Sequence, residues 1–107
     1  MNLKKKCIVC GWDLTDSKGS SLVEGAHVRP HRSGDEFDRP DNIIPLCPNH
    51  HTEFDHYNFY IDANTMKLVF FDTNSEYHGK DVSKEIDYVK KEYIAYEQYL
   101  YNQAHNI

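Results

Sequence analysis

Short apolar runs separated by polar, turn-forming segments characterise the first half of the chain. Residues 22–28 and 42–46 each form such a run and predict two short strands. The segment 31–41 between them is rich in Gly, Asp, Arg and Pro, which favours a loop. Proline is favourable in the first turn of a helix, so Pro48 predicts a helix over about 48–56. The expected order is strand, loop, strand, helix.

The second half of the chain predicts a hairpin and a long helix. Apolar runs at 59–62 and 67–71 flank four turn-forming residues and indicate a β-hairpin across 58–72. Ser83 can cap a helix over 83–104. The apolar positions of this helix step by three and four, as on one helical face; they are Ile86, Val89, Tyr93, Tyr96 and Leu100.

Length and composition predict a single α+β domain over residues 1–107. Its core is small, and domains of this size often depend on a metal. No apolar run approaches the ~20 residues that span a bilayer. Lys4 is followed by no apolar segment of a signal peptide, so we expect a cytoplasmic protein that is not associated with a membrane. Cysteines in that compartment are reduced and favour metal binding over disulfides.

The three cysteines and one histidine have the spacing of a zinc site. Cys7 and Cys10 form one Cys-x-x-Cys pair, and Cys47 and His50 form a second pair of the same spacing. Two such pairs can supply the four ligands of tetrahedral zinc, which leaves no open position and makes the metal structural. Alternatively, Cys7 and Cys10 are small buried residues or a redox pair, although the βαβ context of a thioredoxin-like site is lacking.

The segment Glu24–Pro30, then Asn42, then Leu46–His51 resembles the His-Asn-His (HNH) endonuclease family. His27, Asn42 and His51 are separated by 15 and 9 positions. The resemblance covers roughly residues 24–62 and is closest to a restriction-type branch that carries a structural zinc. It implies one HNH nuclease domain with a ββα-metal (His-Me finger) core over 22–57.

Within that domain, the zinc would join a knuckle at 4–14 to residues 46–51. The hairpin and the C-terminal helix are then additions to the ββα-metal core. The resemblance also implies that DNA is the partner. The net charge of −5 argues mildly against a protein that coats DNA, and is compatible with a nuclease that holds DNA weakly or with help.

The resemblance assigns a role to each member of the triplet. His27 corresponds to the general base, and its ordinary pKa near ~6.5 leaves neutral imidazole at pH 7. Asn42 corresponds to the residue that positions the base and pins the loop. His51 corresponds to a ligand of a catalytic divalent metal, Mg²⁺ or another ion. Asp55 lies one helical turn further on the same face and can complete that site.

Ala26 is the main departure from the family pattern. Many HNH enzymes have a metal-binding Asp or His just before the base, and alanine cannot bind a metal. Glu24 could reach the site instead. The alternative function is a zinc-stabilised nucleic-acid-binding or interaction module with a weakened or inactive nuclease site. A redox or regulatory zinc protein would have to match the triplet spacing by chance.

Two further features concern partners. Arg29 and Arg32 flank the base and can bind DNA phosphates, or can pair with acidic residues of the same loop. The C-terminal helix has more tyrosines than one buried face needs. It is compatible with a homodimer or with a larger restriction-like or phage assembly. The alternative is a helix packed on the hairpin with its tyrosine hydroxyls in solvent.

Overall fold

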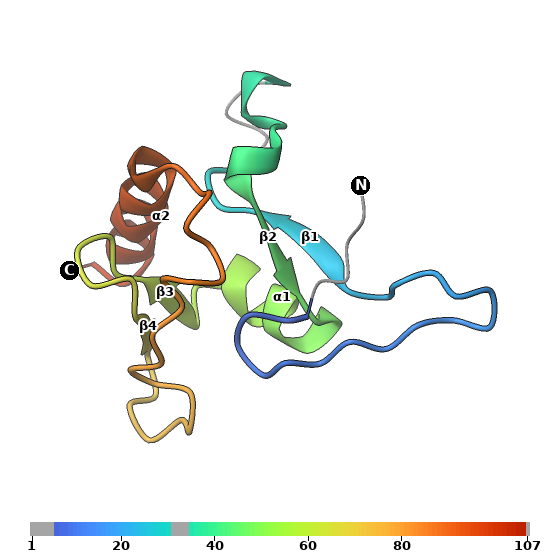
Figure 1. Ribbon diagram of the computed structural model, residues 1–107. Coiled ribbons are helices and arrows are strands. Elements are labelled where there is room, and N and C mark those ends of the chain that lie inside the picture. Colours follow the sequence, from blue (N-terminus) through green and yellow to red (C-terminus); the bar gives the residue numbers. More distant parts are fainter. Residues whose placement is uncertain (1–5, 31–34, 107) are drawn as a thin grey trace.

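A strand pair and a short helix form the centre of the molecule, with a hairpin and a longer helix beside them (Figure 1). The computed structural model describes residues 6–30 and 35–106. Its elements, in chain order, are β1 (Glu24–His27), the 3-10 helices η2 (Asp35–Phe37) and η3 (Pro40–Asn42), β2 (Ile43–Leu46), α1 (Pro48–Asp55), β3 (Phe59–Ile61), β4 (Leu68–Phe70) and α2 (Lys91–Ala104).

Strands β1 and β2 pair antiparallel, and α1 follows after a single residue. His27 lies opposite Ile43 in this ladder. Cys47 is the N-cap of α1, where its sulfur accepts the backbone N–H of His50 at 3.4 Å. Pro48 occupies the first turn, as its fixed backbone angle favours. Helix α1 packs against both strands, which confirms the predicted strand, loop, strand, helix order and the α+β fold.

The hairpin extends the same apolar core. Strands β3 and β4 pair antiparallel within the predicted range 58–72. The Phe59 ring stacks on Phe70 at 4.7 Å and lies 5.3 Å from Phe54 of α1. Met66 adopts a left-handed conformation (φ 59°) in the turn between the strands. Aromatic contacts therefore join the hairpin to the ββα unit.

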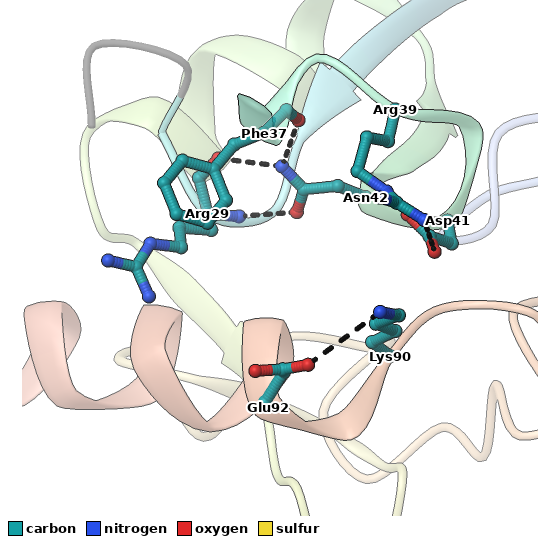
Figure 2. Close-up of polar contacts among 7 residues, drawn as sticks. All are labelled: Arg29, Phe37, Arg39, Asp41, Asn42, Lys90 and Glu92. Carbon is teal, nitrogen blue, oxygen red and sulfur yellow. Dashed lines mark hydrogen bonds and ion pairs between the residues drawn. The ribbon is translucent and has the colours of Figure 1, made fainter. Parts of the chain in front are cut away.

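The C-terminal helix begins at Lys91, so the predicted start at Ser83 is wrong. The segment from Val82 to Lys90 consists of turns. The helix does not include Lys90, because the Lys90 N–H donates to Asp41 O (3.1 Å) and Lys90 itself has an extended backbone (φ −66°, ψ 131°). Asp41 is held in turn by Arg39 at 2.9 and 3.1 Å (Figure 2). The hydrogen bond from Lys90 N–H to Asp41 O replaces the one that Lys90 would make within a continuous helix.

The buried face of α2 also differs from the predicted stripe. Its buried residues are Tyr93, Ile94, Glu97 and Tyr101. Tyr96 and Leu100, which were expected to be buried, are only half-buried. Strand β3 lies against this helix. In residues 6–30 and 35–106, no helix has the length and apolar character needed to cross a bilayer.

Candidate nuclease site and metal centre

Asn42 is fully buried and fastens the loop that follows β1. Its Oδ1 accepts the Arg29 N–H at 2.8 Å, while Nδ2 donates to Arg29 O at 2.9 Å and to Phe37 O at 2.7 Å (Figure 2). Its own carbonyl accepts the Val28 N–H at 2.9 Å. An amide can donate and accept simultaneously without titrating. The side chain therefore orders the backbone immediately after His27.

His27 ends β1 and faces a pocket of about 380 Å³. Its Nε2 lies 3.0 Å from Asp38 Oδ1, which belongs to the loop between η2 and η3. His51 and Asp55 of α1 line the same pocket. The fold thus brings a histidine from the strand and two potential metal ligands from the helix to one cavity.

His51 lies between two carboxylates. Its Nδ1 is 2.8 Å from Glu24 Oε1, and its Nε2 is 3.4 Å from Asp55 Oδ2. Because an ionised carboxylate only accepts, the short contact favours the proton on Nδ1. In a neutral ring the Nε2 lone pair then faces the Asp55 carboxylate. A cation between these two atoms would stabilise that arrangement, so Nε2 and Oδ2 are suitable metal ligands.

Ala26 takes part only in packing. Its exposed fraction is 0%, and it lies opposite Ile44 in the β1–β2 ladder. Glu24 is two positions earlier on the strand, a spacing that places both side chains on one face of the sheet. With no ligand at Ala26, the acidic side chain that β1 brings to His51 is Glu24.

A second cluster joins the N-terminal knuckle to the start of α1. The ligand atoms of Cys7, Cys10, Cys47 and His50 all lie within 4.8 Å of one another. The His50 Nδ1 is 3.2 Å from Cys47 Sγ and 3.6 Å from Cys7 Sγ. Three sulfurs and one imidazole match the preferred donor set and number of tetrahedral zinc. The predicted four-residue metal cluster is confirmed as a group that can hold a metal ion.

Electrostatics of this cluster also favour a cation. Burial lowers the pKa of His50, which keeps the imidazole neutral. Burial, together with the neighbouring Cys7 and Cys47, raises the pKa of Cys10 to about 11 despite the N–H of Trp12. Burial acts to raise the pKa of Cys7, but the neighbouring backbone N–H groups lower it overall. A divalent cation among the three sulfurs would stabilise each of them as a thiolate.

Arg29 is held over α2 by two aromatic rings. Its Cζ lies 4.1 Å from the centroid of Phe37 and 4.0 Å from that of Tyr96. The side chain crosses from the β1 loop toward α2 in Figure 2. Both rings thus lie within cation–π distance of the guanidinium, and its Nε is buried without a hydrogen-bond partner among the described residues. The other predicted phosphate contact, Arg32, lies outside the described residues.

Glu97 is a feature that the sequence analysis missed. It lines the same pocket from α2, is 3% exposed, and neither carboxylate oxygen has a hydrogen-bond partner among the described residues. Burial raises its pKa well above the ordinary value. The spacing of Tyr93, Glu97 and Tyr101 could have revealed an acid on the buried face. The contact of Asp38 with His27 and the contacts of Lys80 with Ile8 and Val9 were also missed, because each joins separate segments of the chain.

Two antiparallel strands and a helix, with histidine, asparagine and histidine at these positions, define a ββα-metal nuclease domain. The model of the HNH endonuclease family matches residues 7–62, which is 56 of the 107 residues. The chain therefore belongs to the HNH endonuclease family. The matched range includes β1, β2, α1, β3 and the four-residue metal cluster.

A solved structure supports the same assignment. The chain is similar to a "Modification dependent TagI restriction endonuclease", with a TM-score of 0.65 and 29% sequence identity. The match covers 89% of this chain and 33% of that protein. The chain thus spans about a third of the length of this structural relative. No curated protein matches the chain.

Proposed function

We propose that this domain is a metal-dependent endonuclease that hydrolyses phosphodiester bonds of DNA. His27 acts as the general base, and a divalent metal ion binds at His51 and Asp55. The convergence of these three side chains on one pocket is the observation that supports the proposal most strongly. The named activity of the structural relative supports DNA as the substrate.

Hydrolysis requires proton removal from water, charge stabilisation at the phosphate and assistance to the leaving oxygen. A neutral His27 ring can accept the proton from water. Asp38, 3.0 Å from the ring, stabilises the positive charge that the ring then carries. Asn42 contributes indirectly, because it holds the backbone of Arg29 and thereby the turn that follows the base. Asn42 is therefore a positioning residue.

His51 Nε2 and Asp55 would hold the catalytic metal, with Glu24 orienting His51 through Nδ1. When bound there, Mg²⁺ or another divalent ion supplies positive charge to the phosphate oxygens. Mg²⁺ commonly keeps several water ligands, so two protein ligands are compatible with binding despite Ala26.

Zinc fits the other cluster as a structural ion, since Cys7, Cys10, Cys47 and His50 would occupy all four positions. This ion would connect the N-terminal knuckle to the first turn of α1. His50 and His51 are neighbours on that helix and face different sites: His50 contacts Cys47 and Cys7, whereas His51 contacts Glu24.

Arg29 would bind a DNA phosphate through the edge of its guanidinium. The rings of Phe37 and Tyr96 fix its plane, which reduces the conformational freedom lost on binding. Because the net charge is −5, DNA affinity depends on such local contacts and on bound metal ions.

The alternative function remains a zinc-stabilised nucleic-acid-binding or interaction module with a weakened site. Ala26 is the observation that favours it, because it supplies no ligand. A homodimer through α2 has less support. Tyr93 and Tyr101 are buried within the chain, and Tyr99, which is 54% exposed, is the clearest candidate for an external contact.

A plasmid cleavage assay tests the proposed function. Wild-type protein should nick or linearise plasmid with Mg²⁺ or Mn²⁺, and EDTA should stop it. His27→Ala should lower the rate by about 10²–10⁴-fold, as expected for loss of a general base. The matched control is His56→Ala, since His56 is an exposed histidine at the end of α1. Equal cleavage by wild type and His27→Ala, at equal purity, would show that His27 is not the base.

A further inference from the structure

Lys80 reaches the N-terminal knuckle from a position 72 residues later in the chain. Its ammonium donates to Ile8 O and to Val9 O, each at 2.9 Å. Ile8 is 3% exposed and Val9 is fully buried, while Lys80 is half-buried, so both hydrogen bonds are partly shielded from solvent. Hydrogen bonds from a charged donor are stronger than neutral ones, and low local polarity strengthens them further.

The backbone of Lys80 is itself fixed, which places the ammonium accurately. Its N–H donates to Tyr77 O at 3.1 Å, and its carbonyl accepts the Leu68 N–H of β4 at 2.8 Å. Tyr77 belongs to the same loop, and its ring lies edge-on to the ring of His50 at a centroid distance of 5.5 Å. The loop after β4 therefore contacts the four-residue cluster at His50 and the knuckle at Ile8 and Val9.

The two carbonyls that Lys80 binds belong to Ile8 and Val9, the two residues between the ligands Cys7 and Cys10. The Ile8 carbonyl shares a peptide plane with the Val9 N–H, and the Val9 carbonyl shares one with the Cys10 N–H. Two hydrogen bonds from one ammonium therefore fix the orientation of both peptide groups. The turn that they form sets the relative position of the Cys7 and Cys10 sulfurs.

The charge of Lys80 also supports the metal centre. Three thiolates and a neutral imidazole around a divalent ion leave a net charge of −1. The Lys80 ammonium is a compact positive charge held beside this turn. The ammonium offsets the excess negative charge of the metal centre. Because the region between them is partly buried, solvent screens this interaction only weakly.

We propose that Lys80 is a positioning residue of the metal centre, which holds the turn between Cys7 and Cys10 through two backbone carbonyls and so keeps both sulfurs placed for the metal. This inference rests on the proposed zinc site and concerns its retention of metal rather than cleavage of DNA.

Zinc release tests the inference. We would compare wild type, Lys80→Met, Lys80→Arg and the control Lys91→Met, which changes an exposed lysine at the start of α2. Each protein is challenged with a chromophoric chelator well below its unfolding temperature. Lys80→Met should release zinc about 10- to 100-fold faster, the usual effect of losing a residue that supports metal ligands. Lys91→Met should match wild type, and Lys80→Arg should recover much of the difference.

A cobalt-substituted sample separates metal tuning from general destabilisation. The sulfur-to-cobalt charge-transfer band should shift in Lys80→Met and return toward the wild-type position in Lys80→Arg, because it reports the electrostatics of the thiolates. If Lys80→Met is poorly folded, excess zinc should restore its fold by mass action.

Three outcomes are decisive. Wild-type protein without zinc would refute the proposed zinc site itself. A zinc-bound wild type with release from Lys80→Met at the control rate and an unshifted cobalt band would refute the role of Lys80 alone. A Lys80→Met protein that stays unfolded in excess zinc would also contradict it, because its role would then be general folding.

Discussion

The two metal-ligand groups of this domain differ in closure. The ligand atoms of Cys7, Cys10, Cys47 and His50 converge within 4.8 Å, with Cys7 and Cys47 buried and the other two residues half-buried. By contrast, His51 and Asp55 line an accessible pocket of about 380 Å³. A closed four-ligand site suits a structural ion, whereas an open site leaves room for water and substrate. In the proposed function, the adjacent residues His50 and His51 of one short helix would serve stability and chemistry separately.

Removal of a ligand from the closed site should have the largest effect. Cys47→Ser keeps a residue that can cap α1 but weakens zinc binding. Because binding of a structural metal is coupled to folding, we expect loss of zinc and of the cooperative unfolding transition, on the scale of a whole domain's stability of about 5–15 kcal/mol. Elemental analysis and circular dichroism would measure this.

The control for that experiment is Asn49→Ala, an exposed substitution in the same turn of α1. It should keep both zinc and the cooperative transition. A folded Cys47→Ser protein with an unchanged midpoint would contradict the view that the closed site supports the fold.

A change beside the open site should affect metal affinity without affecting the fold. Glu24→Gln retains the shape of the side chain but removes the carboxylate that orients His51. We expect the Mn²⁺ concentration for half-maximal cleavage to rise about 10- to 100-fold, with zinc content unchanged. Saturating Mn²⁺ should restore much of the rate. An unchanged metal titration would remove Glu24 from the account.

Glu97 should give the smallest effect, which depends on pH. Its pKa is raised in the folded chain by burial, so the folded state holds the proton more tightly than the unfolded state. This contribution to stability is therefore lost as the pH rises from the pKa of Glu97 in the unfolded state through its pKa in the folded state. Glu97→Gln should reduce this loss, so that its melting temperature relative to wild type increases by a few degrees from pH 5 to pH 8. Parallel melting curves at all pH values would contradict the assignment.

Features set by local spacing were predictable from the sequence. The Cys-x-x-Cys and Cys-x-x-His pairs give the cluster, Pro48 indicates the start of α1, and the two apolar runs give the hairpin. Each depends on residues within one turn or one strand, where side-chain periodicity is informative. The same local reasoning placed His51 and Asp55 on one helical face.

Features set by contacts between distant segments were not predictable. The start of α2 depends on the hydrogen bond from Lys90 N–H to Asp41 O, and the support of the knuckle depends on Lys80. Arg29 was considered a partner of phosphates or acids, yet its guanidinium lies within cation–π distance of Phe37 and Tyr96. Helical periodicity could not identify these partners, because the partner residues lie on other elements.

The separation of the two sites is tested most directly by His51→Ala, with zinc content and plasmid cleavage measured on the same preparation. We predict about one zinc per chain, a wild-type unfolding transition and a cleavage rate reduced by at least about 10²-fold. Loss of zinc together with cleavage would show that the neighbouring histidines serve one metal centre. Full cleavage by the variant would contradict the role of His51 in catalysis.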